Sequence, residues 1–163
     1  MRGNCQEAMA FRNLERKQTF MKILFICFAN VARSQIAQAY FKTISQHHCD
    51  SAGIAVDDLI AKNNLRSRKL KDVPIQKSIE YIKREFNLDL GEKERQQLLP
   101  EMIESADIAI VITEKERWPQ YLKEGSKVMF WDIPDPFGQT DGFANDVYKQ
   151  VQQRVKQLVA EIG

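Results

Sequence analysis

Short apolar runs alternate along this chain with longer stretches in which apolar residues recur at helical spacing. The runs within 22–27, 107–112 and 127–132 predict buried β-strands, because strands covered on both faces are apolar almost throughout. A further strand is predicted around 49–54. Strands that alternate with helices form a parallel sheet between layers of helices. The sequence therefore predicts an α/β protein, a three-layer sandwich with a four-stranded parallel sheet and helices on both faces.

The intervals between these strands carry helical patterns. Helices are predicted at 33–46, at 72–86, at 100–106, at 114–122 with a break near Pro119, and at the C-terminus. The C-terminal helix has an apolar stripe formed by Val147, Val151, Val155, Leu158 and Ile162. Residues 57–71 are polar and basic and are predicted to form a solvated loop.

Length and composition predict one globular domain. The 163 residues, 44% of them hydrophobic, are enough for a proper core. Residues 1–20 show no clear period and are expected to form a flexible N-terminal extension, with residues 21–163 as the domain. A net charge of +2 gives no reason to expect a nucleic-acid partner. No apolar run approaches the roughly 18 residues of a membrane span, and the first twenty residues lack the apolar segment of a secretory signal.

Residues 27–34 join the first predicted strand to the first predicted helix and hold a thiol and a guanidinium. Backbone N–H groups of such a loop can surround a tetrahedral anion. These N–H groups, the helix N-terminus and Arg33 would all lower the pKa of Cys27 from the usual value of about 8.5. Arg33 can also bind two phosphate oxygens at once. We therefore predict a phosphate-binding loop that consists of Phe28, Ala29, Asn30, Val31, Ala32, Arg33 and Ser34.

A carboxylic acid is expected at the same edge of the sheet. Asp135 lies in the proline-flanked loop 133–138, just after the fourth predicted strand, and parallel sheets bind ligands beyond the C-terminal ends of their strands. Attack of the Cys27 thiolate on phosphorus would form a phosphocysteine intermediate. Asp135 would protonate the leaving oxygen and then activate water. Phe137 is either packed or a wall for an aromatic substrate, and we assign it as the wall. This chemistry needs no metal and no cofactor.

Three motifs resemble those of the low-molecular-weight protein tyrosine phosphatases. Residues 27–34 are similar to the C-x5-R-S loop of that family. Ser51-Ala52-Gly53 resembles its second-strand motif, and Asp135-Pro136-Phe137 resembles its general-acid loop. The similarity extends from about Met21 to the C-terminus, so residues 21–163 are expected to form a single phosphatase-like domain.

The resemblance implies a role for each matching residue. Cys27 would be the nucleophile, Arg33 the phosphate clamp and Asp135 the proton donor. A hydrogen-bond network that holds the loop in shape would consist of Asn30, Ser34 and Ser51. The implied protein is a cytoplasmic enzyme, a monomer or weak dimer, that hydrolyses phosphotyrosine in protein substrates. Three unevenly spaced cysteines do not form a disulfide framework, and a reducing cytoplasm would keep the thiolate active.

The sequence departs from the family pattern at several positions. Ala29 stands where glycine is usual, which would cost on the order of 1 kcal/mol if the loop needs a positive φ there. Ala32 stands where a second cysteine often protects the nucleophile from oxidation. Gln35 replaces a common proline, and residues 54–72 lack the tryptophan often found at the pocket rim.

Other functions of the same fold remain alternatives. Relatives that hydrolyse phosphoarginine tend to carry threonine in place of Val31, so the apolar valine favours phosphotyrosine. Arsenate reductases of this fold that use intramolecular thiols need further cysteines, and none follows Cys49. The non-enzymatic alternative is a catalytically impaired phosphate-binding module, in which Ala29 distorts the loop. The adjacent polar residues 47–50 are interpreted as a solvated helix end, because neighbouring side chains there point in different directions and would not converge on a metal.

Overall fold

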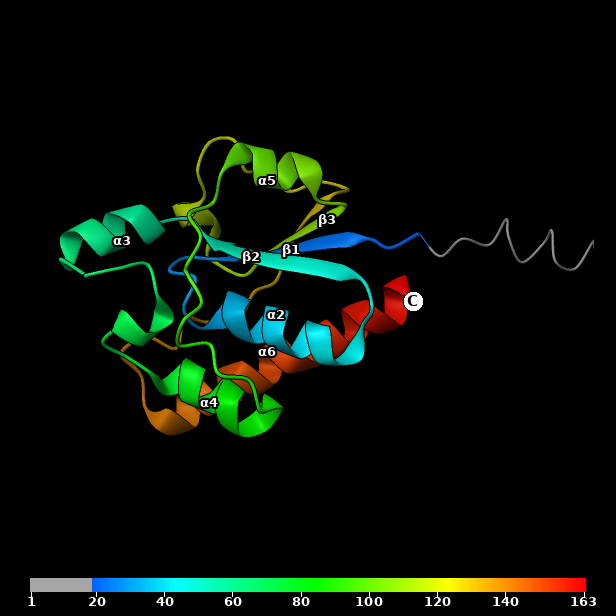
Figure 1. Ribbon diagram of the computed structural model, residues 1–163. Helices are drawn as coiled ribbons and strands as arrows, with labels where there is room; N and C mark the ends of the chain where they lie inside the picture. Colours follow the sequence, from blue (N-terminus) through cyan, green and yellow to red (C-terminus); the bar gives the residue numbers. More distant parts are fainter. Residues whose placement is uncertain (1–18) are drawn as a thin grey trace, which may run out of the picture.

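The computed structural model describes residues 19–163 and shows a four-stranded parallel sheet between layers of helices (Figure 1). The strands are β1 (Lys22–Cys27), β2 (His48–Gly53), β3 (Ile108–Val111) and β4 (Val128–Phe130). Their order across the sheet is β2-β1-β3-β4, and every neighbouring pair is parallel. The predicted α/β sandwich is therefore confirmed. Residues 1–18 of the predicted N-terminal extension lie outside the described residues.

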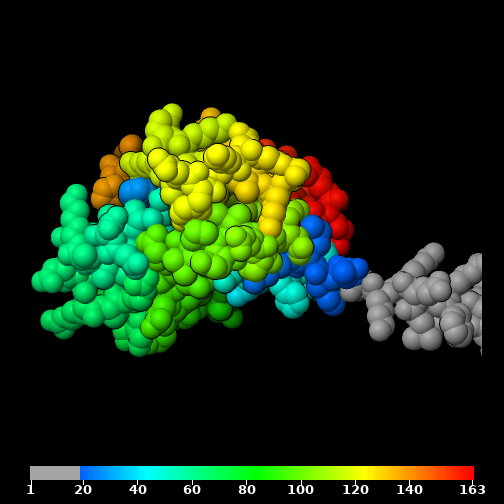
Figure 2. Space-filling view, turned by 90° about the horizontal axis from the view of Figure 1, so that it is seen from above, coloured from blue at the N-terminus to red at the C-terminus, as the bar shows by residue number. Residues whose placement is uncertain are grey.

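Helices cover both faces of this sheet. The helices are α2 (Arg33–Ile44), α3 (Val56–Lys62), α4 (Lys77–Phe86), α5 (Pro100–Ser105) and α6 (Asp141–Ile162). In Figure 1, α2, α4 and α6 lie on one side of the sheet and α5 on the other. Seen from the side of α5, that helix and the yellow segment after β3 cover the sheet, while α3 projects at the left (Figure 2).

Side chains of β1 point alternately into two cores. Ile23 and Phe25 join the larger core, between the sheet and helices α2, α4 and α6. Leu24 and Ile26 join the smaller core on the side of α5. All four are at most 2% exposed. The central position of β1 therefore explains its unbroken apolar sequence and holds its last residue, Cys27, in a fixed place.

Two sequence predictions of local structure are wrong. Residues 56–62 form helix α3 within a segment that was predicted as loop. Only Val56 of this helix is buried, so it shows no apolar period. Acidic residues in its first turn and Lys62 in its last turn suit the helix dipole. The predicted helix at 114–122 is only a 3-10 turn at Lys115–Arg117. Trp118 ends that turn, and its indole N–H donates to the carbonyl of Thr113 at 2.9 Å.

Helix α4 begins five residues later than predicted, at Lys77. Asp72 does not cap it, because the carboxylate of Asp72 accepts a hydrogen bond from Ser67 and the residue closes a 3-10 turn at Leu70–Asp72. The side chain of Gln76 donates to the carbonyl of Leu70 at 2.9 Å and so joins that turn to the start of α4.

Candidate active site

The loop between β1 and α2 has a buried polar base. Cys27 is the last residue of β1 and Arg33 is the first of α2, and each is 2% exposed. Asn30, between them, is fully buried, whereas the other loop residues are partly exposed. The sulfur thus lies among polar groups at the bottom of a short loop rather than in the apolar core.

Two polar groups face the sulfur of Cys27. The backbone N–H of Asn30 donates to Sγ at 3.3 Å, and the hydroxyl oxygen of Ser34 lies 3.0 Å from Sγ. The side-chain amide of Asn30 donates to Ser34 at 2.8 Å and to Ser51 at 3.0 Å. The structure therefore brings together the three residues that were predicted to support the loop: Asn30 and Ser34 contact the sulfur, and Ser51 holds the side chain of Asn30.

The left-handed residue of this loop is Asn30, with a φ of 54°. Asparagine tolerates this conformation better than most residues with a side chain. Ala29 does not have a positive φ. The strain that was considered for alanine at this position is therefore absent, and Ala29 gives no reason to expect a distorted loop.

Gly53 allows the loop to approach β2. A Cβ atom on Gly53 would lie 2.8 Å from the nitrogen of Asn30, 2.8 Å from the carbonyl oxygen of Phe28 and 2.7 Å from a methyl group of Val56. The segment after Gly53 also holds the loop, because the N–H of Ile54 donates to the carbonyl of Cys27 at 3.0 Å. The motif Ser51-Ala52-Gly53 thus supplies a supporting hydroxyl and the space for the loop.

Replacement of Gly53 by alanine is expected to lower kcat/KM by at least about tenfold, because the new Cβ must displace the Asn30 N–H that donates to the sulfur. Steady-state hydrolysis of an aryl phosphate measures the effect. Gly125→Ala is the matched control, since a Cβ there meets nothing within 4 Å. Equal activity of the two variants would show that the close approach does not matter.

Arg33 links the loop to the other end of the site. Its Nη1 donates to the carbonyls of Ile112 at 2.6 Å and Ile133 at 3.1 Å. These carbonyls follow β3 and β4, so both strand ends orient the guanidinium. Nη1 also lies 3.5 Å from Glu114, and Nη2 lies 3.7 Å from Asp135. The predicted phosphate clamp and the predicted proton donor are therefore neighbours.

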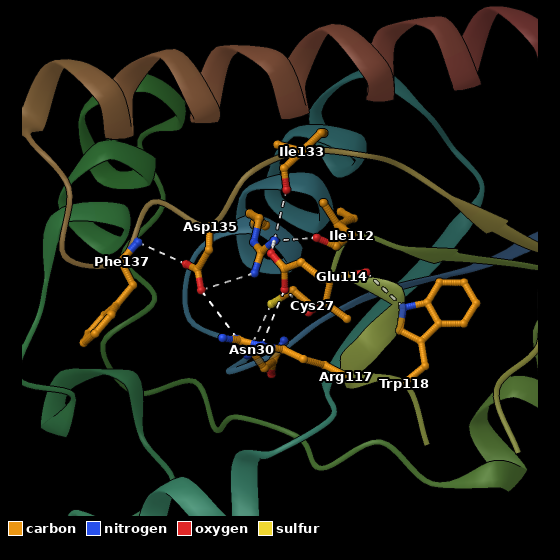
Figure 3. A network of polar contacts seen from close by, with 11 residues as sticks. Cys27, Asn30, Ile112, Glu114, Arg117, Trp118, Ile133, Asp135 and Phe137 are labelled. Atoms are coloured by element: carbon orange, nitrogen blue, oxygen red, sulfur yellow. Dashed lines mark hydrogen bonds and ion pairs between the residues drawn. The ribbon is translucent and has the colours of Figure 1, made fainter. Parts of the chain in front are cut away.

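Asp135 is held at the mouth of the site by its own loop. Its Oδ1 accepts a hydrogen bond from the N–H of Phe137 at 3.0 Å, and its Oδ2 lies 3.8 Å from Arg117. The ring of Phe137 is directed away from this network in Figure 3, and the residue is 73% exposed. Phe137 therefore does not pack in the core and is free to contact a substrate.

Two arginines that sequence reasoning missed also contact the loop. The guanidinium of Arg117 lies 4.2 Å from the ring centroid of Phe28. Arg95 is 3% exposed and donates to the carbonyl of Ala29 through Nε at 3.1 Å and Nη2 at 2.9 Å. Burial lowers the pKa of Arg95, and negative charge on Cys27 opposes that shift. Neither arginine belongs to a motif or an apolar stripe, so the sequence offered no signal for either.

Glu114 is the second acidic group of the network in Figure 3. Although partial burial opposes its ionisation, its own backbone N–H, Arg33 and Thr113 hold the pKa of Glu114 below its usual value. Glu114 therefore stays a carboxylate at neutral pH, paired with Arg33 and, at 3.6 Å, with Arg117.

The other described cysteine has a different environment. Burial raises the pKa of Cys49 to about 11, despite the opposing charges of Lys42 and Lys93. Cys49 therefore stays a thiol at neutral pH and is not a nucleophile.

Across residues 19–163, no group of three His, Cys, Asp or Glu side chains is placed to hold a metal ion. Within the same range, no helix has the length and apolar character needed to cross a membrane.

Known proteins share sequence similarity with this chain. Residues 22–163 match the family model described as low molecular weight phosphotyrosine protein phosphatase. A protein-arginine-phosphatase of Bacillus subtilis (strain 168) is 26% identical over 157 residues, which cover 88% of this chain and 95% of the relative.

Solved structures show the same fold. Vibrio vulnificus Wzb in complex with benzylphosphonate has a TM-score of 0.70 and 24% identity, with 88% of this chain and 99% of that chain covered. YfkJ from Bacillus subtilis has a TM-score of 0.67 and 21% identity, with 90% and 96% covered. Because the family model matches most of its length, the chain belongs to the low molecular weight phosphotyrosine protein phosphatase family.

Proposed function

We propose that this phosphatase hydrolyses phosphotyrosine in protein substrates through a phosphocysteine intermediate on Cys27. The observation that carries the proposal is the position of three groups at one edge of the sheet. The N–H of Asn30 and the hydroxyl of Ser34 face the sulfur of Cys27, and the guanidinium of Arg33 lies 3.7 Å from the carboxylate of Asp135. A nucleophile, an anion clamp and a proton donor are the groups that phosphoryl transfer requires.

In the first step the thiolate of Cys27 attacks phosphorus. The S–P bond forms and the bond from phosphorus to the phenolic oxygen breaks. Asp135, in its protonated form, gives its proton to that oxygen. Arg33 and the backbone N–H groups of the loop stabilise the negative charge on the three equatorial oxygens.

In the second step water attacks the same phosphorus. Asp135, now a carboxylate, takes a proton from the water, and the S–P bond breaks to release inorganic phosphate. Ser34 and the N–H of Asn30 lie within 3.3 Å of the sulfur, where they stabilise it as the leaving thiolate. The same two donors thus serve both steps.

The preference for phosphotyrosine is supported by the side chains around the loop. Phe28 and the exposed Phe137 offer aromatic surface to a phenyl ring. Val31 offers no polar group, and its side chain packs against the larger core. The guanidinium of Arg117 over Phe28 would repel the positively charged guanidinium part of a phosphoarginine side chain.

Phosphoarginine is the second candidate substrate, because the Bacillus subtilis relative is named a protein-arginine-phosphatase. Two peptides of one sequence, one with phosphotyrosine and one with phosphoarginine, separate these candidates. We expect kcat/KM to favour the phosphotyrosine peptide by at least about 100-fold, which corresponds to roughly 2.7 kcal/mol of differential transition-state binding. Equal rates or a preference for phosphoarginine would contradict the proposal. Val31→Thr is expected to shift the ratio towards phosphoarginine.

A reducing compartment such as the cytoplasm suits this chemistry. Position 32, next to Arg33, is alanine, so the loop has no second cysteine that could protect Cys27 as a reversible disulfide. We expect the enzyme to act there on phosphorylated proteins, as a monomer or weak dimer and without a cofactor.

A further inference from the structure

Two buried glutamines lie beneath the phosphate-binding loop and share one lysine. Gln35 and Gln38 of α2 are 0% and 4% exposed. The ammonium group of Lys93 donates to Oε1 of Gln35 at 2.6 Å and also to Oε1 of Gln38. Lys93 lies in the segment before Arg95 and makes no contact with the mouth of the site.

The lysine fixes which way both amides point. An ammonium group can only donate hydrogen bonds, so the two side-chain oxygens must face it. Nε2 of Gln35 is then directed at the backbone carbonyl of Asn30, to which it donates at 3.0 Å. Oε1 of Gln38 also accepts the hydroxyl proton of Ser51 at 2.7 Å.

The hydrogen bonds continue from Gln38 through Ser51, Asn30 and Ser34 to the sulfur of Cys27. Because the Ser51 hydroxyl donates to Gln38, its oxygen is left to accept from the side-chain amide of Asn30 at 3.0 Å. The same amide donates to Ser34 at 2.8 Å, so the hydroxyl proton of Ser34 is directed at Cys27, 3.0 Å away. Asn30 is therefore held from two sides, through its backbone carbonyl and through its side chain.

We propose that Lys93 is a positioning residue for the nucleophile: by orienting Gln35 and Gln38 it holds Asn30 where the Asn30 N–H and the Ser34 hydroxyl both donate to Cys27. The inference rests on the proposed function only in taking Cys27 as the nucleophile. If the Gln35 amide were rotated by about 180°, its oxygen would face the carbonyl oxygen of Asn30, and the two oxygens would repel each other and displace the loop. A turned Gln38 amide would leave the Ser51 proton without an acceptor.

The effect of Lys93 is expected to be partial. Oδ1 of Asn30 also accepts the N–H of Gln96 at 2.9 Å, and this anchor does not depend on the lysine. Burial, followed by the charge of Lys42, lowers the pKa of Lys93 to about 8, while Asp50 and Cys49 oppose the shift. Burial thus disfavours the charged ammonium form of Lys93. The hydrogen bonds that it donates to the two glutamine oxygens offset part of the cost of burying the charge.

The test is the pH dependence of Cys27 alkylation by iodoacetamide, resolved from the other cysteines by mass spectrometry. Lys93→Met is expected to raise the thiolate pKa of Cys27 by about one unit and to lower kcat/KM on an aryl phosphate by roughly tenfold. Lys93→Arg keeps donors for both amides and should restore most of both values. Lys69→Met is the control, because Lys69 is a half-buried partner of the exposed Glu92 and its replacement should leave both values unchanged.

A purely structural lysine would change the melting temperature without moving the alkylation profile. Gln35→Leu removes one of the two links to Asn30 and should shift the profile in the same direction, so it decides the question if Lys93→Met does not fold. A folded Lys93→Met, or in its place Gln35→Leu, with the wild-type profile would overturn the proposal. Alkylation needs no substrate, so this failure is distinct from failure of the proposed function, which would appear as full activity in Cys27→Ser.

Discussion

Replacement of Cys27 by serine is expected to lower kcat on an aryl phosphate by at least about 10^4-fold and to leave the fold intact. A serine hydroxyl holds its proton far more tightly than a thiol, and no residue of the described loop is placed as a base to remove it. The serine hydroxyl is smaller than the thiol, so it fits the same place, and its oxygen can still accept a hydrogen bond from the N–H of Asn30. Steady-state kinetics and the melting temperature measure the two effects.

Cys49→Ser is the matched control for this variant. The high pKa of Cys49 keeps it protonated, so its replacement should leave activity at the wild-type level. Binding of vanadate by the inactive Cys27→Ser protein would show that Arg33 and the loop can still bind an oxyanion. Wild-type turnover by Cys27→Ser would mean that the nucleophile lies elsewhere and that the proposed mechanism is wrong.

The central part of the site could be predicted because its sequence signals are local. The apolar run that ends at Cys27 predicts a strand, and after five intervening residues Arg33 begins a helix, so one short loop must join the thiol and the guanidinium. Asp135 lies more than a hundred residues away in the sequence. It could still be predicted at the same edge, because the strands are parallel and ligands bind beyond their C-terminal ends.

The supporting residues could not be predicted, because their roles depend on how distant segments pack. Residues 93–96 form no helix or strand, yet Lys93, Arg95 and Gln96 all contact the loop or its supports. A lysine or arginine in a polar stretch is usually solvated, and only the close approach of this segment to β2 changes that. Arg117 was missed for a related reason, since the predicted helix around it is only a single turn.

Replacement of Asp135 by asparagine is expected to slow hydrolysis most for phosphate esters whose leaving oxygen needs a proton. Asparagine cannot give up a proton to the leaving oxygen or take one from water. We expect kcat/KM, which reports the step that releases the phenol, to fall by about 10^3-fold for phenyl phosphate and by only about tenfold for p-nitrophenyl phosphate, whose phenolate leaves without a proton. The variant keeps an oxygen that can accept from the N–H of Phe137, so the loop should stay in place.

Asp132→Asn tests whether any loss of charge near the site has the same effect. Asp132 is exposed, is three residues from Asp135 and takes no part in the network of Arg33, so its replacement should leave both rates unchanged. Arg33 retains the carbonyls of Ile112 and Ile133 in the Asp135→Asn protein, so oxyanion binding should persist. An equal loss of kcat/KM on both phenyl esters would assign Asp135 to orienting Arg33, because only a proton donor makes the loss in this first step depend on the leaving group.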